Sequence, residues 1–132
     1  MEEQKKIKKI GVLTSGGDAP GMNAAIRAVV RTGRYFDLNV IGIRKGYNGL
    51  INGEIKEMYS RDVSNVMNLG GTILHTARCP EMMTPEGLDK AAAIYKILSL
   101  DALIVIGGDG SYRGMAELAK RGVNCVGIPA TI

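Results

Sequence analysis

Residues 103–111 combine the residue types that bind phosphate and a metal ion. An apolar run at 103–106 leads into Gly107, Gly108, Asp109, Gly110 and Ser111. The run predicts a buried strand of a parallel sheet, and the glycines let the backbone turn sharply and approach a ligand. Ser111 opens a predicted helix, whose N-terminus attracts an anion. Because a carboxylate would repel phosphate, Asp109 indicates a divalent cation between them. Turn glycines with a helix-capping Asp would explain the same residues without any ligand.

A second glycine turn follows the first predicted strand, residues 7–15. It spans residues 14–21 and reads Thr-Ser-Gly-Gly-Asp-Ala-Pro-Gly. Behind it, apolar residues recur at helical spacing, which predicts a helix with one buried face: Met22, Ala25, Ile26, Val29 and Val30. Strand, glycine turn and helix therefore occur twice in this chain.

The remaining elements complete an alternating pattern. Further strands are predicted at 40–43, 102–106 and 124–129, and helices from Thr84-Pro85 onward and at 111–121. Glycines and asparagines break any period over 46–61, so we expect loops there, with a small hairpin around Asn52-Gly53. Asp62 is expected to cap a short helix that runs through Asn68.

This alternation predicts an α/β fold, a doubly wound and mostly parallel sheet with helices on both faces, similar to a Rossmann domain. In such sheets, ligands bind beyond the carboxyl ends of the strands, where the strand order reverses. Both glycine turns and the segment 129–132 should therefore converge on one crevice.

Composition narrows the function classes. The chain has 132 residues, 45% apolar and 23% charged, which suits one soluble globular domain. Half of its net charge of +4 lies in the first nine residues, and there is no Trp and one Phe, so an anionic small molecule is favoured over nucleic acid. No apolar run is long enough for a bilayer, so we expect a cytoplasmic protein without a membrane partner. The separated Cys79 and Cys125 suggest neither zinc nor a disulfide.

Other polar residues leave two interpretations open. Arg78 lies in a loop with glycines at one end and a proline at the other, where it is either solvated or binds phosphate oxygens as charge develops. His75 is the one histidine and is expected to be structural or superficial. Arg27, Arg31 and Arg34 lie opposite the apolar face of the first helix, as a solvated stripe or a second anion site.

Two common nucleotide motifs are absent. No lysine follows either glycine turn at the Walker A position, which excludes a P-loop NTPase. Neither turn matches G-x-G-x-x-G, so hydride transfer with a dinucleotide is disfavoured.

Taken together, the motifs closely resemble bacterial ATP-dependent 6-phosphofructokinases. They are residues 14–23, Gly70-Gly71-Thr72, Ala77-Arg78-Cys79-Pro80, Gly107 to Ser111, and Pro129 to Ile132. A bare G-G-D-G also occurs in NAD kinases and diacylglycerol kinases, but the ten-residue first block is specific to this family and argues against an NAD kinase.

The resemblance implies transfer of the γ-phosphoryl group of ATP to the 1-hydroxyl of fructose 6-phosphate, with magnesium, in glycolysis. By matching position, ATP contacts are Gly17, Arg78, Cys79, Gly108, Asp109, Gly110 and Ser111. Asp109 would serve the Mg²⁺, Arg78 and Thr131 would be catalytic, and Thr131 and Ile132 would meet the sugar phosphate.

The resemblance also implies regulation, assembly and a preferred donor. Arg27 and Arg31 match an allosteric site for a nucleoside diphosphate, and the family is usually homotetrameric. An arginine usual near the position of Ser60 is found one place later, at Arg61. Small residues at Gly110 and Ala130 favour ATP over pyrophosphate, because pyrophosphate-dependent relatives typically carry Asp and Lys there.

Family members continue beyond the position of Ile132 with an Asp that acts as catalytic base. We therefore expect residues 1–132 to form an incomplete ATP-binding domain without the sugar-phosphate domain, inactive by itself. The competing hypothesis is a nucleotide-binding or assembly module without catalysis.

Overall fold

A five-stranded sheet forms the centre of the computed structural model, which describes residues 6–17, 21–66 and 69–129. Its order is β3-β2-β1-β4-β5, and the strands are β1 (Lys9–Ser15), β2 (Asn39–Ile43), β3 (Ile55–Met58), β4 (Ala102–Gly107) and β5 (Cys125–Pro129). The pairs β2·β1, β1·β4 and β4·β5 are parallel, whereas β3 runs antiparallel to β2. The prediction of a mostly parallel sheet is confirmed.

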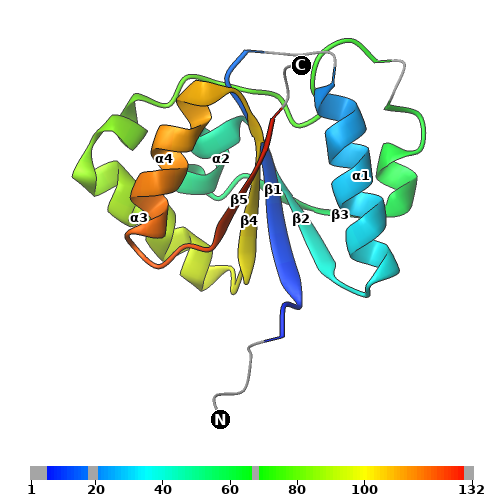
Figure 1. Ribbon diagram of the computed structural model, residues 1–132, viewed down its shortest axis with the longest axis horizontal. Helices are drawn as coiled ribbons and strands as arrows, with labels where there is room; N and C mark the ends of the chain where they lie inside the picture. The colour runs from blue at the N-terminus through cyan, green and yellow to red at the C-terminus, as the bar shows by residue number, and fades with distance from the viewer. Residues whose placement is uncertain (1–5, 18–20, 67–68, 130–132) are drawn as a thin grey trace.

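Helices cover both faces of this sheet, as predicted (Figure 1). On one face lies α1 (Met22–Tyr35), and on the other lie α2 (Gly46–Asn52), α3 (Pro85–Ile97) and α4 (Asp109–Ala119). Each face buries its own apolar cluster, one around Val12 and Ile26 and the other around Leu50 and Leu103. Apolar burial of this kind contributes roughly 25 cal/mol per Å², which explains why the central strands read as continuous apolar runs.

The strand order reverses between β1 and β4. From β1 the chain crosses through α1 to β2 on one side, and β4 pairs with the other side of β1. The carboxyl ends of β1 and β4 therefore border the crevice in which doubly wound sheets bind their ligands.

Helix starts follow the sequence signals closely for α3. The Thr84 hydroxyl accepts the Gly87 N–H at 3.1 Å, and Pro85 occupies the first turn. Several boundaries shift by one or two residues: β1 begins at Lys9, for example, and α4 begins at Asp109, two residues before the predicted start at Ser111. Asp109 and Gly110 thus belong to the first turn of α4.

The expectation for residues 46–61 was wrong. The segment forms the short helix α2 and the edge strand β3, without a hairpin at Asn52-Gly53. Gly53 has φ 72° and ends α2 in the left-handed conformation. Burial of Tyr47, Leu50 and Ile51 against the sheet stabilises α2 despite its glycines, because packing overrides weak local propensity.

Asp62 also has a different place from the one predicted. A 3₁₀ helix, η1 (Ser60–Val63), precedes the predicted helix start, and Tyr59 is its first flanking residue. Asp62 lies inside η1, where its carboxylate accepts the Tyr59 N–H at 2.7 Å. A second 3₁₀ helix, η3 (Pro80–Met83), leads into α3. The predicted end of the helix at Asn68 lies outside the described residues.

Candidate functional site

The two glycine turns lie side by side at the carboxyl ends of β1 and β4. Ser15 and Gly107 are register partners, and Gly107 also pairs with Pro129 of β5. An added Cβ at Gly107 would overlap the Ser111 hydroxyl and lie 2.6 Å from the Ser15 carbonyl oxygen. Glycine is therefore required at 107, and the predicted convergence of the turns is confirmed.

Ser111 carries a buried hydroxyl that lacks a protein partner. The residue is 3% exposed, and its Oγ makes no hydrogen bond within the part of the chain that the structure describes. It lies in the first turn of α4, where its N–H donates to the Gly108 carbonyl oxygen at 3.0 Å. An unsatisfied buried hydroxyl costs about 1–3 kcal/mol, and a helix N-terminus favours an anion. This hydroxyl therefore points to a ligand.

A cavity of about 1180 Å³ extends from the glycine turns toward α3. Its walls near the turns are small or polar, and its further walls are largely apolar. The first set is Ser15, Gly16, Gly17, Gly108, Gly110 and Ser111, and the second includes Tyr47, Cys79, Met82, Met83, Pro85 and Leu88. A cavity with one anion-binding end and one apolar end suits a phosphorylated compound with an aromatic base.

Tyr47 belongs to the apolar wall of this cavity and also contacts the first turn of α4. Its hydroxyl donates to the Ser111 carbonyl oxygen at 2.8 Å, and burial raises the pKa of the phenol so that it stays protonated. The ring leaves no spare room at Gly114, where an added Cβ would lie 3.2 Å from it. Tyr47 was not predicted as a site residue, because residues 46–61 were expected to form loops, although Gly46-Tyr47 follows the carboxyl end of β2 closely.

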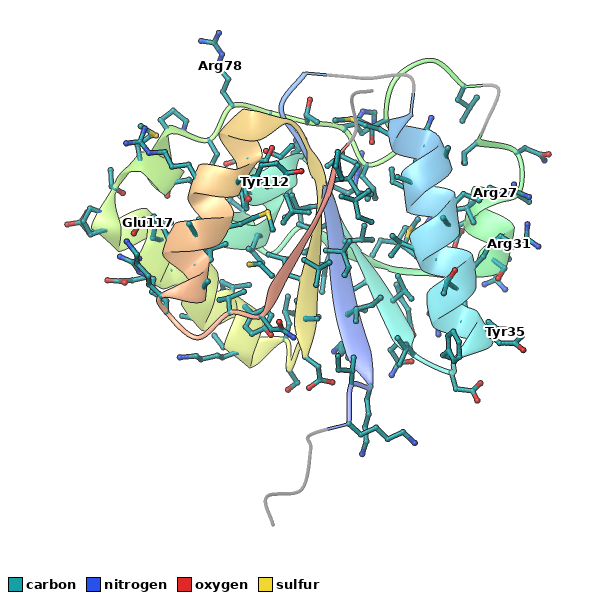
Figure 2. The ribbon with its side chains drawn as sticks, in the orientation of Figure 1. Arg27, Arg31, Tyr35, Arg78, Tyr112 and Glu117 are labelled. Atoms are coloured by element: carbon teal, nitrogen blue, oxygen red, sulfur yellow. The ribbon has the colours of Figure 1, made fainter. Side chains whose placement is uncertain are left out.

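Arg78 and Cys79 line the cavity on the loop that precedes η3. The Arg78 side chain is exposed and extends outward above the carboxyl end of the sheet (Figure 2). Cys79 is half-buried, and burial raises the pKa of its thiol. His75 is exposed and does not line this cavity, so the expectation of a superficial histidine is met.

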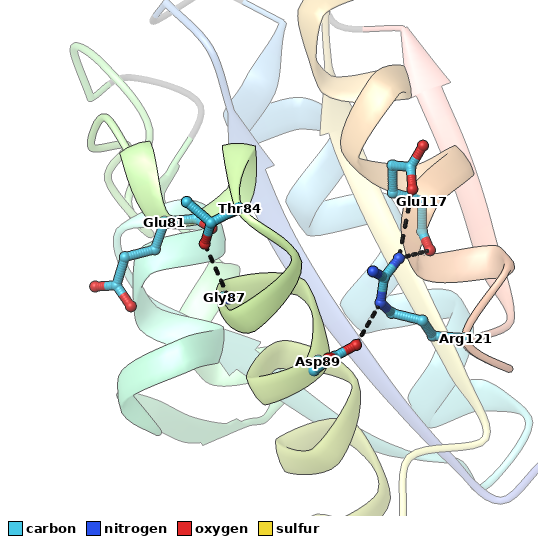
Figure 3. A network of polar contacts seen from close by, with 6 residues as sticks. All are labelled: Glu81, Thr84, Gly87, Asp89, Glu117 and Arg121. Atoms are coloured by element: carbon cyan, nitrogen blue, oxygen red, sulfur yellow. Dashed lines mark hydrogen bonds and ion pairs between the residues drawn. The ribbon is translucent and has the colours of Figure 1, made fainter.

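Arg121 borders the same cavity but is held by acids. Its Nε donates to Asp89 Oδ1 at 2.7 Å, and one terminal nitrogen donates to the Glu117 carbonyl oxygen at 3.0 Å (Figure 3). These contacts tie α4 to α3 and neutralise the guanidinium. Arg78 makes no ion pair with any residue that the structure describes, so it is the more available cation for a ligand phosphate.

The arginine stripe of α1 lies far from the cavity and divides into two parts. The Arg34 side chain is held by contacts within the protein. Its Nε donates to the Met58 carbonyl oxygen at 2.8 Å, and its guanidinium stacks 4.3 Å from the Tyr59 ring centre. Arg61 stacks on the same ring at 4.8 Å. Arg27 and Arg31 instead lie along the outer side of α1 (Figure 2), and the Arg27 Nε is buried without a partner among the described residues.

Several predicted positions carry less structural information. Thr131, Ile132 and Ala130 lie outside the described residues. Among the side chains that the structure describes, which do not include that of Asp109, no three His, Cys, Asp or Glu side chains gather as a metal cluster. None of the described helices has the length and apolar character needed to cross a bilayer.

Comparison with known proteins identifies the family. The family model described as phosphofructokinase matches residues 9–132. The chain belongs to the phosphofructokinase family. This agrees with the α/β fold and with the glycine turns at the strand-order reversal.

Individual phosphofructokinases resemble the chain over nearly all of its length. It is 61% identical over 126 residues to an ATP-dependent 6-phosphofructokinase of Clostridium botulinum, covering 96% of this chain and 40% of that protein. The corresponding protein of Clostridium acetobutylicum is 57% identical with the same coverage. The chain therefore spans about two-fifths of the length of the curated relatives it matches.

Solved structures agree with this assignment. The phosphofructokinase of Saccharomyces cerevisiae superimposes with a TM-score of 0.83 at 38% identity, covering 93% of this chain and 20% of that one. A pyrophosphate-dependent phosphofructokinase from Marinobacter aquaeolei gives a TM-score of 0.73 at 17% identity, covering 93% of this chain and 33% of that one. The fold is thus shared with a pyrophosphate-dependent phosphofructokinase and does not by itself select the donor.

Proposed function

We propose that this chain is the ATP-binding part of an ATP-dependent 6-phosphofructokinase. In the intact protein it would help transfer the γ-phosphoryl group of ATP to the 1-hydroxyl of fructose 6-phosphate, giving fructose 1,6-bisphosphate and ADP. The similarity to two proteins named ATP-dependent 6-phosphofructokinase supports this reaction. The main structural support for an ATP site here is the Ser111 Oγ at the start of α4, which is buried and lacks a hydrogen-bond partner among the described residues.

The proposal gives each cavity residue a role. Gly17, Gly108 and Gly110 let the phosphates approach the backbone, and Ser111 donates its hydroxyl to a phosphate oxygen. Arg78 swings from its exposed position to stabilise charge on the transferring phosphoryl group, a contribution of about 10²–10³ in rate for one well-placed donor. The apolar end, including Cys79, takes the base.

Asp109 is the residue we assign to magnesium. Mg²⁺ in nucleotide sites is typically held by one or two carboxylates plus substrate phosphates. Asp109 lies in the first turn of α4 beside the glycine turns, so its carboxylate suits an ion that is held mainly by the nucleotide. When bound, the ion would neutralise charge on the β- and γ-phosphate oxygens.

Only part of the proposed sugar-phosphate site would come from this chain. Thr131 and Ile132 would contact it, with Thr131 close to the reacting groups. The rest of that site, including the base that takes the hydroxyl proton, would come from the intact protein. Residues 1–132 are accordingly proposed as an incomplete ATP-binding domain, without turnover of their own. Cytoplasmic location is part of the same proposal.

The proposed preference for ATP over pyrophosphate as phosphoryl donor rests on the open space at the start of α4. An added Cβ at Gly110 would meet no described atom within 4 Å, which leaves room there for a nucleoside. The intact protein should phosphorylate fructose 6-phosphate with ATP and fail with pyrophosphate. Turnover with pyrophosphate and none with ATP would overturn the choice of donor.

A substitution tests the site itself. In the intact protein, Ser111→Ala should weaken ATP binding by about tenfold, equivalent to about 1.4 kcal/mol. Ser64→Ala, at an exposed serine that does not line the cavity, is the control. Unchanged ATP affinity in Ser111→Ala would refute the assignment.

A second ligand site is proposed on α1. The buried and unpartnered Nε of Arg27 favours an anion there, and Arg31 lies one turn further along the same side. We assign this site to a nucleoside diphosphate effector. A homotetramer would be the assembly in which it acts.

A further inference from the structure

Asn23 is a buried polar residue within the first turn of α1. It is 4% exposed and uses both ends of its amide. Its Oδ1 accepts the Ile73 N–H at 2.8 Å, and its Nδ2 donates to the carbonyl oxygens of Gly71 at 2.5 Å and Val66 at 3.3 Å. A single side chain thus holds both ends of a loop far away in sequence to the helix that follows the first glycine turn.

The same loop has a second anchor on β1. The buried hydroxyls of Thr14 and Thr72 lie 3.0 Å apart, and the Thr14 hydroxyl also donates to the His75 carbonyl oxygen at 3.2 Å. Behind them, the Lys45 N–H donates to the Leu74 carbonyl oxygen at 2.8 Å. The segment 71–75 is therefore fixed between α1 on one side and the ends of β1 and β2 on the other.

The backbone of this segment adopts conformations that need such support. His75 has φ 62°, a left-handed conformation that costs a non-glycine residue about 1 kcal/mol or more. Gly71, whose carbonyl oxygen accepts from Asn23, has φ 72°. Arg78 follows three positions after His75, a reach of about 10 Å for an extended chain. The hydrogen bonds that hold segment 71–75 therefore limit where this loop can place the Arg78 side chain.

We propose that Asn23 is a positioning residue for Arg78. Its amide joins α1, which begins directly behind the first glycine turn, to the loop that carries Arg78, so that the phosphate-binding turn and the backbone from which the Arg78 side chain swings keep one relative position. The inference rests on the proposed function, because it presupposes that Arg78 acts on the transferring phosphoryl group. It adds a residue whose importance lies in hydrogen bonds to the backbone, away from the ligand.

Asn23→Asp is the sharpest variant, because aspartate has the same shape but no N–H. Its carboxylate would face the carbonyl oxygens of Gly71 and Val66, which repel it. In the intact protein we expect kcat to fall about tenfold or more, with KM for fructose 6-phosphate changed less than about twofold. Asn52→Asp, at an exposed asparagine that bonds to Asn48, is the matched control and should retain full activity.

A double-mutant cycle separates positioning from a loss of stability. Arg78→Lys should lower kcat strongly in the natural background but by less than about threefold once Asn23→Asp is present, because the arginine is already misplaced. All four proteins are compared below their unfolding temperatures. If Asn23→Asp does not fold, Asn23→Ser takes its place in the cycle, since it removes the same bonds without introducing a charge.

The outcomes are distinguishable. Coupled effects of the two substitutions support the inference. If Arg78→Lys lowers kcat and the two effects multiply independently, Asn23 acts on stability alone and the inference is overturned. If Arg78→Lys leaves kcat unchanged in the natural background, the role given to Arg78 fails, and the inference fails with it. Loss of activity in the Asn52→Asp control also overturns it, because the effect would then not be specific to Asn23.

Discussion

The backbone oxygen of Ser15 and the α-carbon of Gly107 lie so close that no side chain fits between them. The two residues are register partners at the carboxyl ends of β1 and β4, and an added Cβ at Gly107 would lie 2.6 Å from the Ser15 carbonyl oxygen. The second obstacle is the Ser111 hydroxyl, which the same Cβ would overlap. Close packing of two strand ends and a helix start therefore forms the floor of the candidate phosphate site.

Neighbouring glycines should consequently respond differently to the same substitution. Gly107→Ala should destabilise the fold by about 1–3 kcal/mol through overpacking. Gly108→Ala should cost less than about 1 kcal/mol, because its backbone is extended (φ −94°, ψ −166°) and its Cβ would meet no described atom within 4 Å. That Cβ would project into the space assigned to phosphate, so ATP affinity should fall at least tenfold.

Denaturant unfolding and ATP titration of the intact protein measure the two effects separately. Gly70→Ala, another glycine with open space around its Cβ position, is the control for Gly108→Ala. Equal ATP affinity in Gly108→Ala and the unsubstituted protein would contradict a phosphate at this turn. A stable Gly107→Ala variant would contradict the close packing beneath it.

The sequence predicted the sheet and the meeting of the glycine turns because both depend on repeating patterns. Apolar runs, helical spacing and the rule that ligands bind at the strand-order reversal place residues 15–17 beside 107–111 without any knowledge of side-chain contacts. Thr84 and Pro85 likewise act within one turn of chain. Local patterns thus sufficed wherever the determining interactions are local or periodic.

Two features escaped prediction because packing and tertiary contacts decide them. In the helix α2, an added Cβ at Gly49 would overlap the Arg44 carbonyl group, so the glycine that weakens the helical pattern is required by packing. The role of Asn23 leaves no local signal in the sequence, because its hydrogen-bond acceptors at Val66 and Gly71 lie more than 40 positions away. Nothing within one helical turn distinguishes it from a solvated asparagine.

The arginines of α1 should separate into effector-binding and structural residues. Arg27→Ala and Arg31→Ala should each weaken the response of the intact enzyme to ADP by about tenfold or more, because each removes a cation from the proposed anion site. Activity without effector should remain unchanged, since neither residue lines the nucleotide cavity. Initial rates over a range of ADP concentrations, at fixed ATP, measure the response.

Arg34→Ala is the informative comparison for that series. Its bond to the Met58 carbonyl oxygen and its stacking on Tyr59 predict a loss of about 1 kcal/mol in unfolding free energy. Arg31→Ala should leave stability within about 0.5 kcal/mol of the original, as expected for an exposed residue. An undiminished ADP response in both Arg27→Ala and Arg31→Ala would rule out the second site.

Asp62 should make stability depend on pH in the acidic range. The Tyr59 N–H and, more weakly, the Lys56 ammonium 3.5 Å away lower the pKa of this carboxyl group in the folded protein. A lowered folded pKa means that the stabilisation is present above the unfolded value, about 3.9, and is lost as pH falls through the folded value. The melting temperature of Asp62→Asn should therefore lie below that of the original protein at pH 6, with the gap closing below about pH 4.

Lys56→Gln provides the graded comparison, because it removes only the weaker interaction and should produce a smaller gap at pH 6. Thermal unfolding followed at a series of pH values from about 6 to 3 measures all three proteins. A gap between Asp62→Asn and the original that stays constant over this range would show that the carboxylate charge contributes nothing.

Cys79 should report on occupancy of the nucleotide cavity through its reaction with iodoacetamide. Burial raises the pKa of its thiol, so little thiolate exists at neutral pH and alkylation should be slow. The rate should still climb steeply between about pH 8 and pH 9, where an ordinary cysteine begins to level off. Because Cys79 lines the cavity next to Arg78, saturating MgATP should slow the reaction further.

Mass spectrometry of peptides distinguishes alkylation of Cys79 from alkylation of Cys125, whose thiol pKa is raised by burial to about 11. The Cys79→Ser variant should lack the ATP-sensitive part of the alkylation. Alkylation of Cys79 at the same rate with and without MgATP would place the nucleotide elsewhere.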